Sequence, residues 1–161
     1  MVLQIEAFES SDCITSTYGT LVLHLGGQPA IFGSQWGYRS GTNKDVDWPF
    51  ERLNASRRTP CELMSDWHGL EVVWTRNPDW ESAWQQIRTT LDAGQPVIVV
   101  ADAFHLAYCW QYQKQHSPHR IVLYGYADDA VEISDGYRGS LHRGLLPLTM
   151  LQSAVTSDGL L

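Results

Sequence analysis

Cys13 is the residue of this sequence best placed to act as a nucleophile. It follows Ser10, Ser11 and Asp12, which are residue types that cap helices, and it begins an apolar pattern of helical spacing. Unpaired backbone N–H groups in the first turn of a helix stabilise a thiolate, so the pKa of a cysteine there falls below its usual value of about 8.5. The sequence therefore predicts a reactive thiol at Cys13.

A histidine and an aspartate later in the chain have the spacing of partners for this thiol. His119 begins one strand-like run and Asp135 follows the next, with Asp128 and Asp129 as the turn between them. The open ends of an antiparallel hairpin meet, so we expect these two side chains to lie together. The histidine would exchange a proton with the thiol, and the carboxylate would fix the orientation of the imidazole.

Each of these residues also has a purely structural interpretation. Cysteine is among the most buried residue types, so a cysteine in a helix is more often part of the core. His119 could cap an edge strand, and Asp135 before Gly136 could start a turn. The order Cys, His, Asp, with each residue at the end of an element, favours the catalytic interpretation.

Two further cysteines are alternatives to Cys13. Cys61 follows a proline and could also begin a helix, which makes it the rival nucleophile, whereas Cys109 is expected to be packed between aromatic neighbours. Three widely spaced cysteines suggest neither a disulfide framework nor a zinc knuckle. No pair of histidines or carboxylates has the spacing of metal ligands, so we predict no metal.

An α+β fold would position these residues. Periodic patterns predict helices over 13–25, from Asn77-Pro78 to Gly94, and over 147–155. Apolar runs predict strands over 97–100, 119–126 and 130–134, the last two forming the hairpin, and a further strand over 70–75. We expect the N-terminal, cysteine-bearing helix to pack on a mostly antiparallel sheet.

Length and composition indicate a single domain over residues 1–161. The chain is 43% hydrophobic and 18% charged, as is typical of globular proteins. Its net charge of −7 disfavours nucleic acid as a partner. No apolar run approaches the ~18 residues of a membrane span, and the N-terminus lacks the features of a signal peptide. We therefore expect no membrane association and a cytoplasmic location.

The segment between Gly33 and Pro60 differs in charge from the rest of the chain. It holds five basic and three acidic residues, a net charge of +2, whereas the remainder holds six basic and fifteen acidic residues. Long segments of this kind often form binding loops. We expect it to dock an acidic partner through four arginines, namely Arg39, Arg52, Arg57 and Arg58.

Two stretches of the sequence resemble the butirosin-biosynthesis-H-type N-terminal domain family. DCITSTYGTLVLHLGGQPAIFGSQWGYRS resembles that family's opening of cysteine, helix and glycine. AGQPVIVVADAFHLAYCWQYQKQHSPHRIVLYGYADDAVEISDGY resembles its second signature of strand, aspartate, tyrosine-bearing loop, histidine, hairpin and aspartate. The family is similar in fold to the papain-like cysteine peptidases that process bacteriocin leaders, which implies a papain-like α+β fold.

The resemblance implies the chemistry of a cysteine acyltransferase. It implies Cys13 as nucleophile, His119 as base and acid, and Asp135 as the orienting group. Asp102 and Tyr108 are candidates to contact the substrate, although a strand-end aspartate is as often a cap. The family's namesake takes an aminoacyl group from a carrier-protein thioester and passes it to an amine. This implies an acyl or peptidyl carrier protein as partner, an amine or other small molecule as acceptor, and no cofactor beyond the phosphopantetheine that carries the substrate.

Two positions depart from the pattern of papain-like peptidases. The glutamine that they usually place six residues before the cysteine is Ala7 here, and the glycine that often follows the cysteine is Ile14. The oxyanion would then depend on the backbone N–H of Cys13 and a second donor, for which Gln4 is a candidate. This departure disfavours ordinary proteolysis.

Three functions therefore stay open from the sequence. The first is cysteine-dependent acyl transfer, or thioester cleavage, on carrier-bound acyl or aminoacyl intermediates in peptide or polyketide natural-product biosynthesis. The second is a papain-like cysteine peptidase or amidase. The third is a catalytically degenerate module that binds a carrier protein. In each case the chain could be one domain of a larger synthetase.

Overall fold

Four antiparallel strands form the sheet on which the molecule is built. The computed structural model describes residues 2–33, 39–40, 53–54 and 58–160. The strands are β3 (Val97–Asp102), β4 (Pro118–Tyr126), β5 (Ala130–Asp135) and β6 (His142–Pro147), in that spatial order. Two further strands, β1 (Arg39–Ser40) and β2 (Leu53–Asn54), form a separate antiparallel pair. The main sheet is a meander, in which each strand pairs with the next along the chain.

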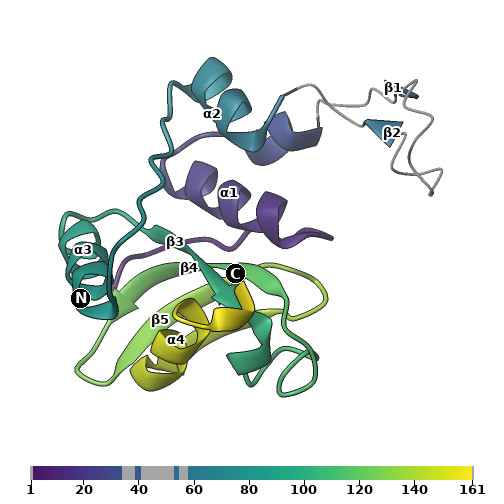
Figure 1. The fold of residues 1–161 in the computed structure, drawn as a ribbon. Helices are drawn as coiled ribbons and strands as arrows, with labels where there is room; N and C mark the ends of the chain where they lie inside the picture. Colours follow the sequence, from purple (N-terminus) through teal and green to yellow (C-terminus); the bar gives the residue numbers. More distant parts are fainter. Residues whose placement is uncertain (1, 34–38, 41–52, 55–57, 161) are drawn as a thin grey trace.

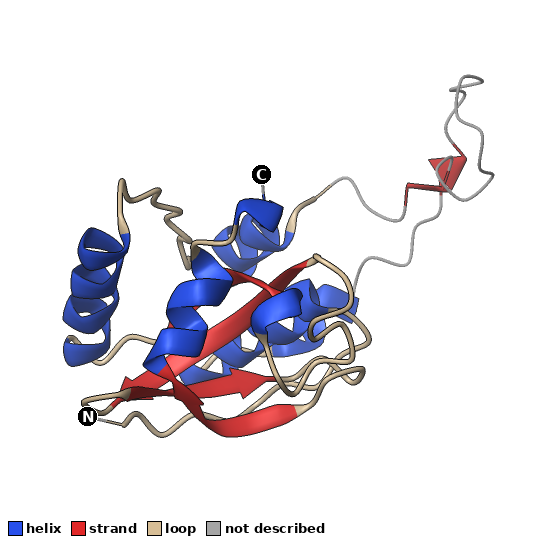
Figure 2. Ribbon diagram, turned by 60° about the horizontal axis from the view of Figure 1, so that its bottom comes forward, coloured by secondary structure: helices blue, strands red, loops and turns tan. Residues whose placement is uncertain are grey.

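Helices cover both faces of this twisted sheet (Figures 1 and 2). Helix α1 (Cys13–His24) lies over one face and α4 (Leu148–Val155) over the other. Helix α3 (Trp80–Asp92) packs against β3 and β4, and α2 (Pro60–His68) packs against α1. Within the described residues, no helix is long and apolar enough to cross a lipid bilayer.

Strand β4 is buried on both of its faces. Ile121 and Leu123 belong to the core shared with α3 and α4, whereas Val122 and Tyr124 pack on the α1 side of the sheet. Successive side chains of a strand point to opposite faces, so this alternation is that of a central strand. The packing on both sides fixes the start of β4, where His119 lies.

A side-chain cap fixes the start of α1. The carboxylate of Asp12 accepts a hydrogen bond from the backbone N–H of Thr15 at 2.7 Å. The helix ends at His24, and Gly26 follows in the left-handed region with a φ of 78°. The predicted helix over 13–25 is thus confirmed, and the cap places Cys13 in its first turn.

The other predicted elements are mostly confirmed, including the 119–126 and 130–134 hairpin and the 147–155 helix. The helix predicted from Asn77-Pro78 instead begins at Trp80. The carboxylate of Asp79 caps it by accepting the backbone N–H of Ser82 at 2.7 Å. Aspartate at this position therefore sets the start of α3.

The strand predicted over 70–75 is wrong, and strand β6 of the main sheet was not predicted. Leu70 and Val72 pack against the core beneath α1 and α2 without joining the sheet, and Val73 is 73% exposed. The sequence of β6, HRGLLP, has no clean alternation and contains Gly144, whose φ is 143°. Residues 142–147 form a strand because they pair with β5, and the local sequence pattern does not predict this pairing.

A short parallel bridge joins the N-terminal segment to the end of β5. The backbone N–H of Ser10 donates to the carbonyl of Gly136, and that of Arg138 donates to the carbonyl of Ser10, each at 2.9 Å. We call this contact the Ser10 joint. It holds the chain just before Cys13 against the chain just after Asp135.

Gly136→Ala is expected to lower the free energy of unfolding by about 1–3 kcal/mol, the usual cost of overpacking. A Cβ at this position would overlap the backbone carbonyl of Phe8, which cannot move without displacing the N-terminal segment. Urea unfolding followed by circular dichroism measures the change. Gly33→Ala is the matched control, because a Cβ there meets no atom within 4 Å. Equal losses of stability in the two variants would contradict the steric explanation.

Candidate active site

Cys13 is the first residue of α1, and its thiol is partly buried. Burial alone raises the pKa of this thiol. A hydrogen bond with the side chain of His119 and one from the backbone N–H of Arg120 lower it, and the positive charges of both side chains lower it further. The net pKa lies below the ordinary value for cysteine, which favours the nucleophilic thiolate.

His119, near the start of β4, contacts Asp135 at the end of β5. Its Nε2 lies 2.6 Å from Oδ2 of the carboxylate, and both side chains are buried. Because Nε2 faces Asp135, Nδ1 is the ring nitrogen left for the Cys13 thiol. Burial alone lowers the pKa of His119, but hydrogen bonds with Asp135 and Cys13 and the negative charges of these groups raise it to about 9. The imidazole is therefore protonated at neutral pH.

Two donors that sequence reasoning missed hold the Asp135 carboxylate. The backbone N–H of Tyr137 donates to Oδ1 at 3.0 Å. The hydroxyl of Ser140 donates to Oδ2 at 2.9 Å, and Oδ2 is the oxygen that also faces His119. Both donors come from the turn DGYRGS after β5. An aspartate followed by glycine and serine is the signal from which a turn folded around the carboxylate could have been expected.

Cys109 is a second thiol close to this pair. One atom from each of Cys109, His119 and Asp135 lies within 4.8 Å of the others. Burial raises the pKa of the Cys109 thiol to about 11, in spite of a hydrogen bond with Ser140 that lowers it. The residue is buried, as predicted. A buried, protonated thiol is a poor nucleophile, so the geometry favours Cys13 over Cys109.

Cys61 is the second residue of α2, so the expected helix at this cysteine is present. Its thiol is partly buried and donates a hydrogen bond to the hydroxyl of Tyr18 at 3.2 Å. Among the described residues, the Cys61 thiol thus contacts the phenol of Tyr18, whereas the Cys13 thiol contacts the imidazole of His119. Cys61 therefore lacks the base that an attacking thiol needs.

The cluster of Cys109, His119 and Asp135 also has the residue types of a metal site. Bonds of about 2.0–2.3 Å in tetrahedral geometry place two zinc ligands more than about 3 Å apart. The separation of 2.6 Å between His119 and Asp135 is that of a hydrogen bond. A cation would have to replace the proton in this bond, so the observed arrangement is suited to acid–base chemistry.

Asp102 organises the fold at the end of β3. Its buried carboxylate accepts the backbone N–H groups of Phe104 and Ser117 at 3.1 Å each and the hydroxyl of Ser157 at 2.6 Å, and it lies 2.6 Å from Nδ1 of His116. Burial alone raises the pKa of Asp102, but these hydrogen bonds hold it well below its usual range. All the polar partners of this side chain belong to the loop after β3 and the C-terminal tail, so the structure gives it the role of a cap.

Tyr108 lies close to the Asp135 carboxylate. Its ring stacks on His142 with 4.4 Å between ring centroids. Burial, followed by the negative charge of Asp135, raises the pKa of Tyr108 far above its ordinary value. The hydroxyl is buried and has no hydrogen-bond partner of ordinary geometry among the described residues. Tyr108 thus contacts the carboxylate that orients His119, and its contact with a substrate stays a prediction.

The structure does not bring Gln4 to the thiol. Gln4 is exposed, and its carbonyl lies 3.3 Å from Nδ1 of His24 at the C-terminal end of α1. Cys13 is at the opposite end of this helix, roughly 16 Å away at a rise of about 1.5 Å per residue. An oxyanion near Cys13 must therefore find other donors.

Backbone N–H groups at the start of α1 are such donors. Asp12 accepts the N–H of Thr15 through its side chain and that of Ser16 through its carbonyl. In the described part of the chain, no acceptor contacts the N–H groups of Cys13 and Ile14. Unpaired N–H groups at a helix start can stabilise negative charge.

The four arginines predicted to dock a partner are only partly described. Arg52 and Arg57 lie outside the described residues, and of Arg39 only the backbone is described, in β1. Arg58 forms an exposed ion pair with Asp66 at 2.6 Å. Docking through this segment stays a prediction.

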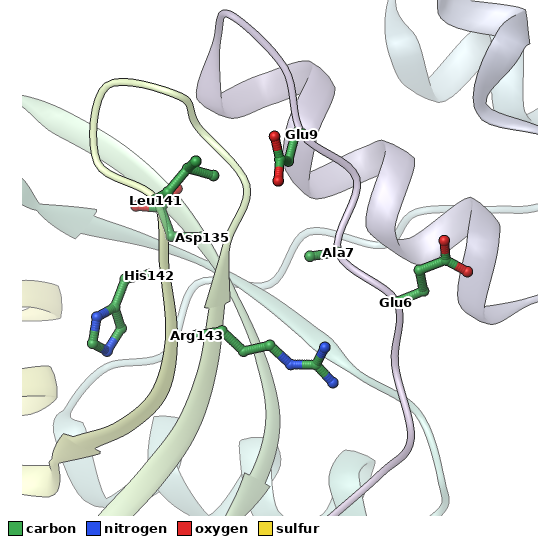
Figure 3. Close-up of a pocket in the computed structure, with 7 residues that line it drawn as sticks. All are labelled: Glu6, Ala7, Glu9, Asp135, Leu141, His142 and Arg143. Atoms are coloured by element: carbon green, nitrogen blue, oxygen red, sulfur yellow. The ribbon is translucent and has the colours of Figure 1, made fainter.

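A pocket of about 430 Å³ opens beside Asp135 (Figure 3). The N-terminal segment, the end of β5 and the start of β6 line it, through Glu6, Ala7, Glu9, Asp135, Leu141, His142 and Arg143. Arg143 points toward the N-terminal segment, where it donates to the carbonyl of Ile5 at 2.9 Å. Ala7 is part of this wall and offers no side-chain donor.

Comparisons with known proteins agree with this arrangement. Residues 12–136, which include Cys13, His119 and Asp135, match the family model described as "Butirosin biosynthesis protein H, N-terminal". Among solved structures, a protein described as a C39-like peptidase from Bacillus anthracis is similar, with a TM-score of 0.57 and 15% identity over 99% of this chain and 90% of that chain. This similarity confirms the predicted peptidase-like α+β fold. No curated protein matches the sequence.

Proposed function

The chain belongs to the family described as butirosin biosynthesis protein H, N-terminal, and on this premise we propose that it is a cysteine acyltransferase acting on carrier-bound thioesters. The continuous contact from Asp135 through His119 to Cys13 is the observation that supports this proposal. A cysteine that is already ionised beside an imidazolium can attack a carbonyl directly, whereas a neutral thiol must first transfer its proton to a base.

In the first half of the proposed reaction, the Cys13 thiolate attacks the carbonyl carbon of the donor thioester. A new C–S bond forms, and the carbonyl oxygen becomes an oxyanion that the N–H groups of Cys13 and Ile14 would stabilise. When the oxyanion collapses, the C–S bond to the carrier breaks. The carrier thiolate takes the proton from the His119 imidazolium and leaves as a thiol. The acyl group is then a thioester of Cys13.

In the second half, an amine attacks the acyl-enzyme carbonyl. Neutral His119 accepts the proton that the amine nitrogen loses, and the bond between Cys13 and the acyl carbon breaks to release an amide and the Cys13 thiolate. The enzyme thus returns to its thiolate–imidazolium form. Throughout, Asp135 stabilises the imidazolium and keeps Nδ1 directed at the sulfur.

A cysteine peptidase or amidase is the second candidate, and the similarity of the fold to a C39-like peptidase favours it. Ala7 argues for acyl transfer, because this chain lacks the glutamine on which papain-like peptidases rely. A module that binds a carrier protein without catalysis would not need a polarised thiol. We therefore place carrier-bound thioesters first, with an acyl or peptidyl carrier protein as partner and an amine as acceptor.

Incubation with an acyl-pantetheine thioester, followed by intact mass spectrometry, tests this proposal. We expect a mass increase equal to one acyl group, and its loss when a panel of amines is added. Rapid release of free acid without an amine would favour hydrolysis. Cleavage of peptides in place of thioesters would favour the peptidase, and no reaction with any donor would favour the binding module.

The thiolate–imidazolium pair predicts a bell-shaped pH dependence of kcat/KM for acyl transfer. The acid limb should lie below the ordinary cysteine pKa, because Cys13 must be ionised and its pKa is lowered. The alkaline limb should lie near pH 9, where His119 loses the proton that the leaving group needs. Iodoacetamide labelling of Cys13, mapped by peptide mass spectrometry, checks the acid limb. Labelling that becomes rapid only above about pH 8.5 would contradict a lowered pKa.

A further inference from the structure

Arg120 directly follows His119 in β4, and its side chain lies on the α1 side of the sheet. Its guanidinium carbon is 5.9 Å from the ring centroid of Tyr18 on α1 and 5.4 Å from that of Trp74. Its backbone N–H contacts the sulfur of Cys13. Two aromatic rings therefore hold a partly buried cation beside the proposed nucleophile.

This cation has no carboxylate partner among the described residues. The ion pairs found there are Arg58 with Asp66, His116 with Asp102 and His119 with Asp135. A partly buried guanidinium loses part of its hydration, and the usual compensation is a carboxylate bound in a bidentate manner. The faces of aromatic rings satisfy the charge in part and leave the planar N–H groups free to bind an anion.

We propose that Arg120 binds a carboxylate carried by the acyl group, so that the preferred donors are carboxyacyl thioesters. This inference rests on the proposed acyl transfer. Between the two half-reactions the acyl group is bonded to the sulfur of Cys13, so it must lie close to the neighbours of that sulfur, which include Arg120. The phosphate of phosphopantetheine is the other anion of such a donor, but it lies at the far end of the arm from the thioester. The position of Arg120 therefore favours the acyl carboxylate.

Matched pairs of donors test this inference. Succinyl, glutaryl and adipoyl thioesters of pantetheine are each compared with the thioester in which a carboxamide replaces the terminal carboxylate. The rate of acyl-enzyme formation is followed by intact mass spectrometry without acceptor, and spontaneous loss of each thioester is subtracted. Hydrogen bonds to charged groups contribute about 1.5–3 kcal/mol, so we expect at least one carboxylate donor to react about 10–100 times faster than its amide.

Arg120→Gln should abolish this preference, and Arg120→Lys should retain part of it. Loss of the positive charge also raises the pKa of Cys13, which slows both donors of a pair equally, so the ratio of the two rates is the readout. Arg88→Gln is the matched control, because Arg88 also lies over an aromatic ring, 5.9 Å from the centroid of Trp84 on α3. This variant should keep the wild-type ratio. Circular dichroism and iodoacetamide labelling of Cys13 show that each variant is folded.

The outcomes separate this inference from the function on which it rests. Equal rates for carboxylate and amide in the wild type, or an unchanged ratio in Arg120→Gln, overturn the role of Arg120 and leave acyl transfer intact. If phosphopantetheine donors react faster than pantetheine donors, and this difference is lost in Arg120→Gln while carboxylate and amide donors react equally, Arg120 binds the phosphate and the inference is overturned. No adduct with any donor, from an enzyme whose Cys13 labels normally, overturns both proposals.

Discussion

Cys13→Ala is expected to abolish the acyl-enzyme and to lower the rate of acyl transfer by at least about 10³-fold, as the loss of a nucleophile does in comparable enzymes. No other described thiol has the same combination of a helix start, partial exposure and an imidazole partner. Intact mass spectrometry with an acyl-pantetheine donor measures the adduct, and release of free pantetheine measures the rate.

Cys61→Ala is the matched control for this experiment. Cys61 is also partly buried in the first turn of a helix, but its thiol donates to the hydroxyl of Tyr18. We expect the adduct and the rate to be retained. An adduct that persists in Cys13→Ala and disappears in Cys61→Ala would assign the nucleophile to Cys61. An adduct on Cys109 would contradict the pKa argument, since burial keeps that thiol protonated.

Asp135→Asn is expected to lower the rate of acyl transfer by up to about 10⁴-fold, the loss that follows when an amide replaces the carboxylate of a catalytic triad. The substitution keeps the size of the side chain but removes the charge that stabilises the His119 imidazolium. The pKa of His119 should fall from about 9, and the alkaline limb of the pH profile should move to lower pH. Labelling of Cys13 at neutral pH should slow, because the imidazolium that polarises the thiol is lost.

Asp102→Asn is a closely matched control for that substitution. Asp102 is also fully buried, and its carboxylate lies 2.6 Å from a histidine nitrogen, the same distance as in the pair of Asp135 and His119. Its partners belong to the C-terminal tail and the loop after β3, so the loss should appear in stability and not in rate. A similar loss of rate in both variants, measured per folded molecule, would contradict a special role for Asp135.

The parts of the site that local patterns encode could be predicted from the sequence. Asp12 before an apolar periodicity predicts both α1 and the position of Cys13, because a cap is a local interaction. The hairpin that brings His119 to Asp135 follows from two alternating runs with a turn between them. The strand predicted over 70–75 is wrong because an apolar run becomes a strand only where a neighbouring strand accepts its hydrogen bonds.

The remaining parts of the site depend on contacts between distant segments. The place of Arg120 between two aromatic rings requires Tyr18 and Trp74 to converge from α1 and from an irregular segment. Gln4 is a plausible donor by sequence distance, but the direction in which the N-terminal segment crosses the sheet carries it to the other end of α1. Such placements follow from packing, which a single sequence does not reveal.

The Ser10 joint has a consequence for the order of events during synthesis. Cys13 leaves the ribosome well before the strands that carry His119 and Asp135, because both residues lie far later in the sequence. Until β4 and β5 have formed and residues 136–138 bind Ser10, the thiol lacks the imidazolium that polarises it. A nascent or truncated chain should therefore be slow to react with thioesters or electrophiles in the cell. Reactivity of Cys13 would then report that the chain through residue 138 has been made and has folded.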